Sequence, residues 1–217
     1  MAALLNIAGR LDVCNIINQY IKSPRAYRPE KPIRNNLTAG ITFLLAAIGR
    51  VCMPTSKRGW WNWAKTTTCE YLLRYSLSKI DSQHFWDLMD SLPIEAIEKI
   101  ENQLLTKVLD IYKLQSDTLF FDTTNFYTYI HTTNKRCTIA QRGKNKQKRY
   151  DLRQVGLAMV VTRQDMIPLF HLTYQGNIND TKVFVTVIRS LKNRLKALEL
   201  DIEKHTVVFD RGNNSKN

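Results

Sequence analysis

The chain has few cysteines, and their spacing argues against the commonest cysteine-based frameworks. Four cysteines occur in its 217 residues, namely Cys14, Cys52, Cys69 and Cys137. No two of them form a C-x-x-C pair, and no histidine lies at the distance from them that a zinc finger requires. We therefore expect four reduced cysteines that pack as small apolar side chains, not a disulfide framework or a structural zinc site.

Long apolar segments are also missing. The longest apolar run is the nine-residue stretch 41–49, whereas a helix that crosses a bilayer needs about 20 residues. The chain starts Met-Ala-Ala-Leu-Leu without a basic leader, so its start does not resemble a secretory signal. There is no internal repeat and no low-complexity tract. These observations predict a cytoplasmic protein without a membrane segment.

Acidic residues are scarce relative to basic ones. Lys and Arg number 32 against 19 Asp and Glu, which gives a net charge of +13, and 44% of the residues are hydrophobic. This hydrophobic content is enough for the packed core of one large domain or two modest ones. The positive field favours polyanions, so nucleic acid is the leading partner. The alternative is a solvated basic surface with no dedicated ligand.

The first half of the chain, residues 1–115, is predicted to be a helical region that could bind DNA. Its clearest segment runs from Pro93 to Leu114, where apolar residues recur at spacings of three, four and seven and so share one helix face. Asp81 or Ser82 is expected to cap a shorter helix upstream. The segment 22–32 contains three prolines and several charges, which indicates a linker.

The second half, residues 116–217, is predicted to contain a mixed sheet, so that the whole chain belongs to the mixed α/β (α+β) class. The expected strands are 119–121, 126–130, 155–162, 167–174 and 207–209. A turn at 163–165 makes the third and fourth of these a hairpin. An amphipathic helix at 181–200 should follow, with its basic residues, Arg194 among them, largely on the outside.

Two aspartates stand out because each follows a short apolar run. Asp122 closes Thr-Leu-Phe-Phe-Asp and Asp210 closes Thr-Val-Val-Phe-Asp. The expected topology makes their strands parallel, so both aspartates would emerge at one edge of the sheet although 88 residues separate them. Two carboxylates at one edge suit the hard divalent cations that assist phosphodiester cleavage. The simpler alternative is that each aspartate accepts hydrogen bonds from its own following turn.

Four short motifs follow one another in a specific order. They are Asp122-Thr-Thr-Asn-Phe, then Gly143-x-x-Lys146-x-x-Arg149-x-Asp151-Leu-x-Gln154, then Gly176-Asn-x-x-Asp180, and finally Asp210-Arg-Gly-Asn-Asn-Ser. In this order the set resembles the DDE transposases of bacterial insertion sequences, specifically the insertion sequence four group. The resemblance covers about residues 117–217 and implies an RNase H-like catalytic domain.

The resemblance also implies roles for individual residues. Asp122 and Asp210 correspond to catalytic metal ligands, which bind Mg²⁺ or Mn²⁺ in that family. The basic stretch between them corresponds to a segment that lies near the DNA. Its candidate DNA-binding residues are Arg142, Lys144, Lys146, Lys148, Arg149 and Arg153. Without the resemblance, the same stretch would be read as a mobile, solvated basic loop.

Family members carry a third carboxylate, a glutamate on a helix well after the Asp-Arg-Gly motif. The present sequence continues for seven residues after Asp210, and Glu199, Asp201 and Glu203 match no motif. We therefore expect the N-terminal portion of a transposase that is inactive alone. One face of its sheet would lack the covering helices that follow in the family.

The resemblance implies DNA cleavage at transposon ends followed by strand transfer, with transposon ends and target DNA as partners. A second hypothesis is a non-catalytic DNA-binding or inhibitory protein that pairs with itself or with intact transposase. A third is a metal-dependent nuclease with no role in transposition.

A cluster of tryptophans beside Lys57 and Arg58 is open to two interpretations. Trp60, Trp61 and Trp63 could stack on bases, but core packing is the better explanation for at least two of them. The four histidines are scattered through the sequence. We expect them to be structural residues with satisfied hydrogen bonds.

Overall fold

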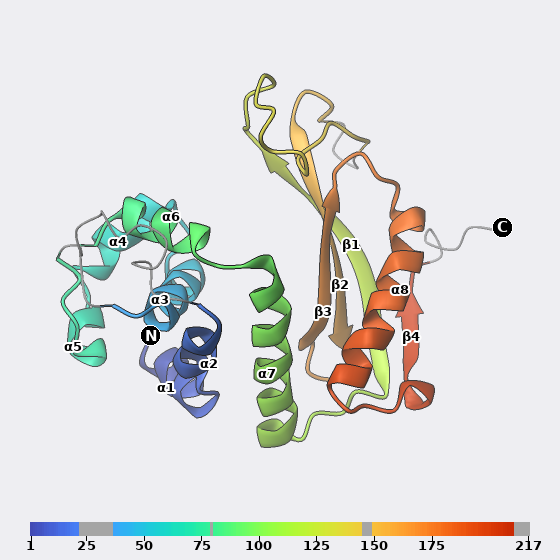
Figure 1. Ribbon diagram of the computed structural model, residues 1–217, viewed down its shortest axis with the longest axis horizontal. Helices are drawn as coiled ribbons and strands as arrows, with labels where there is room; N and C mark the ends of the chain where they lie inside the picture. Colours follow the sequence, from blue (N-terminus) through green and yellow to red (C-terminus); the bar gives the residue numbers. More distant parts are fainter. Residues whose placement is uncertain (22–36, 79, 145–148, 211–217) are drawn as a thin grey trace. The chain divides into compact units, whose positions relative to one another are not determined.

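The computed structural model describes residues 1–21, 37–78, 80–144 and 149–210, so the expected linker at 22–32 lies outside the described residues. Over these ranges the chain forms eight α-helices and a four-stranded sheet, which confirms the mixed α/β class (Figure 1). It divides into two compact units, Met1–Ile111 and Tyr112–Asn217. The division falls within a few residues of the boundary expected at 115. No helix in the described ranges is both long and apolar enough to cross a membrane.

The first unit is helical. Its elements are α1 (Ala2–Arg10), α2 (Val13–Tyr20), α3 (Ala39–Cys52), α4 (Lys57–Ala64), α5 (Cys69–Leu73), α6 (Ser82–Asp90) and α7 (Ile94–Tyr112). Side-chain caps fix the start of three of them, because Thr38, Ser56 and Asp81 each accept a hydrogen bond from the backbone N–H three residues on. Such caps satisfy N–H groups that have no partner inside the helix. Asp81 is thus the cap of α6, one of the two candidates predicted.

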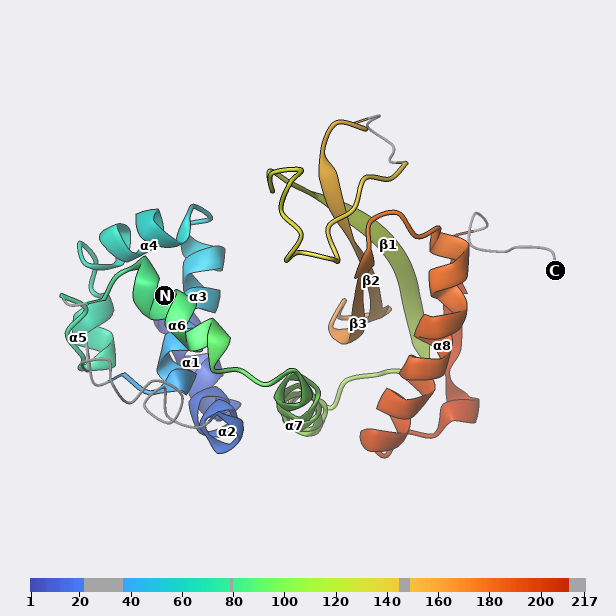
Figure 2. The same ribbon diagram turned by 45° about the horizontal axis from the view of Figure 1, so that its top comes forward.

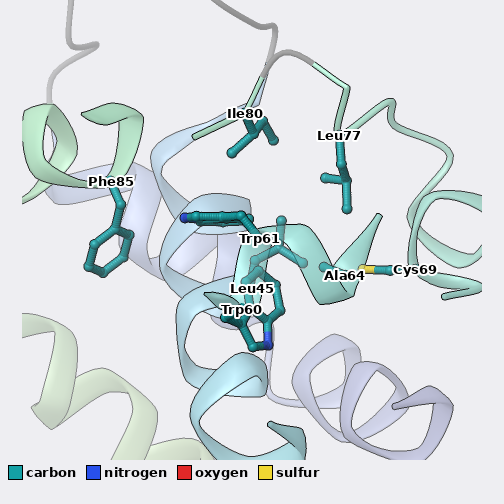
Figure 3. Close-up of a cluster of buried hydrophobic side chains, with 8 residues drawn as sticks. All are labelled: Leu45, Trp60, Trp61, Ala64, Cys69, Leu77, Ile80 and Phe85. Atoms are coloured by element: carbon teal, nitrogen blue, oxygen red, sulfur yellow. The ribbon is translucent and has the colours of Figure 1, made fainter. Parts of the chain in front are cut away.

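The core of α3, α4 and α6 is built around two tryptophans. Trp60 and Trp61 are 4% and 2% exposed, and their rings meet edge to face with centroids 4.5 Å apart. Figure 3 shows both indoles among the other buried side chains of this cluster, which are Leu45, Ala64, Cys69, Leu77, Ile80 and Phe85. Because both indoles are buried, neither is free to stack on a nucleic-acid base.

The cysteines and histidines largely match the predictions made for them. All four cysteines carry free thiols, and Cys69 is buried. Three histidines have side-chain partners, since His84 lies 3.1 Å from the hydroxyl of Thr42 and His131 lies 2.8 Å from that of Thr133. His205 contacts the hydroxyl of Ser116 at 3.1 Å. It lies just before the last strand.

The second unit contains one sheet with strand order β3-β2-β1-β4. The strands are β1 (Thr118–Thr128), β2 (Arg153–Thr162), β3 (Pro168–Gln175) and β4 (Thr206–Phe209). β2 is antiparallel to both β1 and β3, whereas β4 is parallel to β1. Pro168 begins the edge strand β3, where its missing N–H interrupts no central ladder.

One prediction about the sheet is wrong. The runs 119–121 and 126–130 were expected to be separate strands, with Asp122 ending the first. They form a single strand, because β1 pairs with β2 without a break from Leu119 to Thr128. Its pairing with β4 ends earlier, at Phe121. Asp122 therefore lies inside β1, one residue beyond the end of the parallel pairing.

α8 (Asp180–Ala197) connects β3 to β4 and lies along one face of the sheet (Figures 1 and 2). Its buried stripe is made by Val183, Val187, Leu191, Leu195 and Leu198, at the spacing that the sequence predicted. Arg194 is an exception, since it is 4% exposed where an outward position was expected. It falls on the stripe because it is three residues from Leu191 and four from Leu198.

Candidate functional site

Asp122 and Asp210 lie next to each other at the end of the parallel strand pair. Phe121 and Phe209 are Cα partners in the β1–β4 ladder, and each aspartate is the next residue in its chain. Neighbouring strands are about 4.8 Å apart. The fold therefore brings together two carboxylates that are 88 residues apart in sequence.

Both aspartates lie on the same face of the sheet. The rings of Phe121 and Phe209 each contact the ring of Phe184 in α8, with centroids 5.3 Å and 4.4 Å apart. These two phenylalanines therefore face α8. Successive side chains of a strand point to opposite faces, so Asp122 and Asp210 belong to the face that α8 does not cover. Both are exposed.

The local hydrogen bonds leave carboxylate oxygens for a ligand. Oδ1 of Asp122 accepts a hydrogen bond of 2.7 Å from the backbone N–H of Thr123, the kind of local bond that the simpler alternative anticipated. This bond uses one oxygen and fixes the direction of the carboxylate. A hard cation such as Mg²⁺ binds through one or two protein carboxylates and completes its shell with water and substrate phosphates. The pair fits that pattern.

No further acid, histidine or cysteine joins the pair to make a three-ligand group within the described residues. His171 lies in the same row of the sheet, because Met159 is the partner of both His171 and Asp122, but two strand spacings of about 4.8 Å separate it from Asp122. Asp201 and Glu203 precede β4, at the opposite end of the strand from Asp210. Their position therefore excludes them from binding the same ion as Asp122 and Asp210.

The loops that carry the basic residues extend past the far end of the paired strands β1 and β2 (Figure 1). Arg142, Lys144 and Arg149 are exposed there. Lys146 and Lys148 lie outside the described residues. Residues 129–153 contain eight Lys and Arg and a single Asp. We call the described residues 129–144 and 149–153 the ribbon tip.

Arg153 holds the ribbon tip together. Its guanidinium donates to the backbone carbonyls of Asn134 at 2.9 Å and Thr132 at 2.6 Å. The side chain of Asn134 in turn accepts hydrogen bonds from the backbone N–H groups of Arg136 and Cys137. Arg153 was predicted as a DNA contact; two of its five N–H donors are used in these bonds, and its contact with DNA stays a prediction. Its role here is to position the loop that carries Lys135 and Arg136.

Gln154 is a second brace that the sequence did not reveal. It is 1% exposed, and its amide nitrogen donates to the carbonyls of Gly176 at 2.7 Å and Lys144 at 3.2 Å. The approach is so close that a Cβ on Gly143 would lie 2.1 Å from the carbonyl oxygen of Gly176. The start of the basic segment is thus tied to the end of β3.

Arg149 is paired with an acid. Its Nε and Nη2 donate to the two carboxylate oxygens of Asp151 at 2.9 Å and 2.8 Å. This hydrogen bond lowers the pKa of Asp151 to about 2 and raises the pKa of Arg149. The Arg-x-Asp spacing in a loop was the only sequence signal for this pair.

The tip and the aspartate pair are connected by the ribbon itself. Thr128, the partner of Arg153, lies six positions along β1 from Asp122. At about 3.4 Å per residue this is roughly 20 Å, the length of about six base pairs of duplex DNA. One DNA segment is long enough to reach both places. No protein-family model, curated protein or solved structure matches this chain.

Proposed function

We propose that this protein is related to the DDE transposases of bacterial insertion sequences, in whose intact members an RNase H-like sheet cleaves DNA at transposon ends and transfers the strand to target DNA. The observation that carries the proposal is the register of β1 and β4, which puts Asp122 and Asp210 side by side on one face. The order of the four sequence motifs supports it independently. Such a protein works on chromosomal DNA, in the cytoplasm of a bacterium.

Asp122 and Asp210 are the proposed ligands of Mg²⁺ or Mn²⁺. When bound, such an ion activates the attacking oxygen and stabilises the leaving oxygen of a phosphodiester. The chain's own contribution is to hold two carboxylates one strand spacing apart. The N–H of Thr123 orients one of them through its bond to Oδ1. The aromatic contacts of Phe184 fix the two strands that carry them.

The ribbon tip is the proposed DNA-binding surface. Its cations attract the phosphate backbone, and such contacts position DNA without reading its sequence. Arg153 and Gln154 keep the tip in place through bonds to backbone carbonyls. A duplex that follows the ribbon would thereby present a phosphodiester to the aspartate pair.

Nicking of supercoiled plasmid DNA tests the proposal. The chain is incubated with plasmid and Mn²⁺, and open circles are counted for the parent, Asp122→Asn, Asp210→Asn and the control Asp165→Asn. Asp165 is an exposed acid in the turn between β2 and β3. Because only two carboxylates meet at this site within the described residues, we expect the parent to nick slowly but above the metal-free background. Both site variants should fall to that background, and the control should match the parent. Parental nicking by Asp122→Asn and Asp210→Asn would overturn the proposal.

A DNA-binding protein without chemistry is the second candidate. The observation in its favour is that the ribbon tip is braced without any bond to Asp122 or Asp210, so binding does not depend on the aspartate pair. Such a protein would occupy transposon ends, alone, as an oligomer or with intact transposase. It predicts DNA binding by the parent with no metal-dependent nicking.

A further inference from the structure

The ribbon tip presents an aromatic ring that is almost fully exposed. Tyr129, directly after β1, is 87% exposed, the largest exposed fraction among the large hydrophobic side chains described. Tyr150, on the other side of the tip, is 55% exposed. A protein gains nothing in stability from a large ring left in water. Exposed aromatic rings beside cations are the arrangement that proteins use to bind single-stranded nucleic acids.

The surroundings of Tyr129 are cationic and ordered. Lys135 and Arg136 are exposed on the loop that Arg153 braces against the start of β2. Arg149 is exposed on the other side of the tip, next to Tyr150 in sequence, and two hydrogen bonds to Asp151 fix its guanidinium. The tip thus carries an exposed ring together with exposed cations, on a loop whose backbone is held by hydrogen bonds.

This combination selects one class of ligand. Lys and Arg attract phosphates, and aromatic rings stack on bases that have left the double helix. The bases of a paired duplex are stacked on one another and offer no free face to a protein ring. A surface for duplex backbone alone would need cations but no exposed tyrosine.

We propose that the ribbon tip binds unpaired DNA, with a base stacked on Tyr129 and the adjoining phosphates held by the cations around it. The inference rests on the proposed function, in which cleavage produces DNA ends next to the aspartate pair. It adds that the protein recognises unpaired DNA at those ends. The site described here comprises Tyr129, Lys135, Arg136 and Arg149.

Fluorescence anisotropy with three labelled DNAs tests the inference. They are a 20-nucleotide oligo(dT), a blunt 20-base-pair duplex, and the same duplex with an unpaired dT overhang. The proteins are the parent, Tyr129→Ala, Tyr129→Phe and Tyr71→Ala. Tyr71 is a suitable control because it is 68% exposed and belongs to the helical unit. The melting temperature of each variant shows that it is folded.

We expect Tyr129→Ala to lose about 5- to 100-fold in affinity for the oligo(dT) and the overhang, which is the usual effect of one stacked base. Its affinity for the blunt duplex should stay within about twofold of the parent, because phosphate contacts supply most of the binding to paired DNA. Tyr129→Phe keeps the ring and should bind as the parent does, and so should Tyr71→Ala.

Two results would overturn the inference while leaving the proposed function intact. One is an unchanged affinity of Tyr129→Ala for the oligo(dT) and the overhang. The other is an equal loss on blunt and unpaired DNA, which would assign Tyr129 a structural role. If the parent binds none of the three DNAs, the proposed function itself fails.

Discussion

The carboxylate of Asp151 binds the guanidinium of Arg149 through two hydrogen bonds, of 2.9 Å and 2.8 Å. The bond holds the pKa of Asp151 at about 2, below the ordinary value of 3.8. Because the folded pKa is the lower one, the contribution of this pair is complete above about pH 4 and is lost as the pH falls through 2.

An NMR titration of the Asp151 carboxyl carbon checks this assignment. We expect a midpoint near 2 in the parent and a shift toward 3.8 in Arg149→Gln, which removes the charged donor. An identical midpoint in both proteins would show that Arg149 does not hold Asp151 in solution.

Removing the acid should also change DNA binding. The carboxylate of Asp151 accepts from the two N–H donors of Arg149 that a phosphate would use. Asp151→Asn should therefore bind duplex DNA more tightly. The plot of log K against log salt should steepen by about one unit, as expected for one additional phosphate contact. Asp165→Asn serves as the matched control. Weaker binding by Asp151→Asn would mean that the acid presents Arg149 to DNA instead of competing with it.

The brace made by Arg153 can be tested by limited proteolysis. Arg153→Ala removes the donors to Asn134 and Thr132, so the loop should open more often and trypsin should cut faster after Lys135 and Arg136. Mass spectrometry of timed digests measures the rates. Arg163→Ala, in the exposed turn after β2, should digest at the parental rate. Equal rates after Lys135 in both variants would contradict the brace.

Two glycines of the helical unit predict opposite effects of the same substitution. A Cβ on Gly49 would lie 2.1 Å from Nε1 of Trp60, whereas a Cβ on Gly9 meets nothing within 4 Å. Gly49→Ala should therefore lower the free energy of unfolding by about 1–3 kcal/mol, the usual cost of overpacking. Gly9→Ala should raise it by about 0.5–1 kcal/mol, because alanine favours the helix. Urea unfolding followed by tryptophan fluorescence measures both, and equal effects would contradict this packing.

Sequence patterns were sufficient where one local rule decides the structure. The three- and four-residue spacing of apolar positions predicted α7 and α8. The polar residues before an amphipathic run predicted a cap at Asp81 or Ser82, and the structure has it at Asp81. The two parallel strands followed from the helix that connects β3 to β4. These features depend on neighbours in sequence, which periodicity can report.

The sequence predictions failed where contacts between residues far apart in the chain decide the structure. Asp122 was predicted to end a strand because a polar run follows it, but pairing with β2 carries β1 on to Thr128. Arg194 was expected on the outside because it is charged, yet its position on the buried stripe of α8 overrides that preference. The bonds from Gln154 to Gly176 join residues 22 apart, and no local pattern announces them.

The central claim is that Asp122 and Asp210 together bind one divalent cation, and Mn²⁺ binding to four proteins tests it most directly. Isothermal titration is carried out on the parent, Asp122→Asn, Asp210→Asn and the double variant. Because both carboxylates serve one ion, each single change should weaken binding at least about tenfold and the double variant should lose little more. Single variants that bind Mn²⁺ as tightly as the parent would contradict the claim.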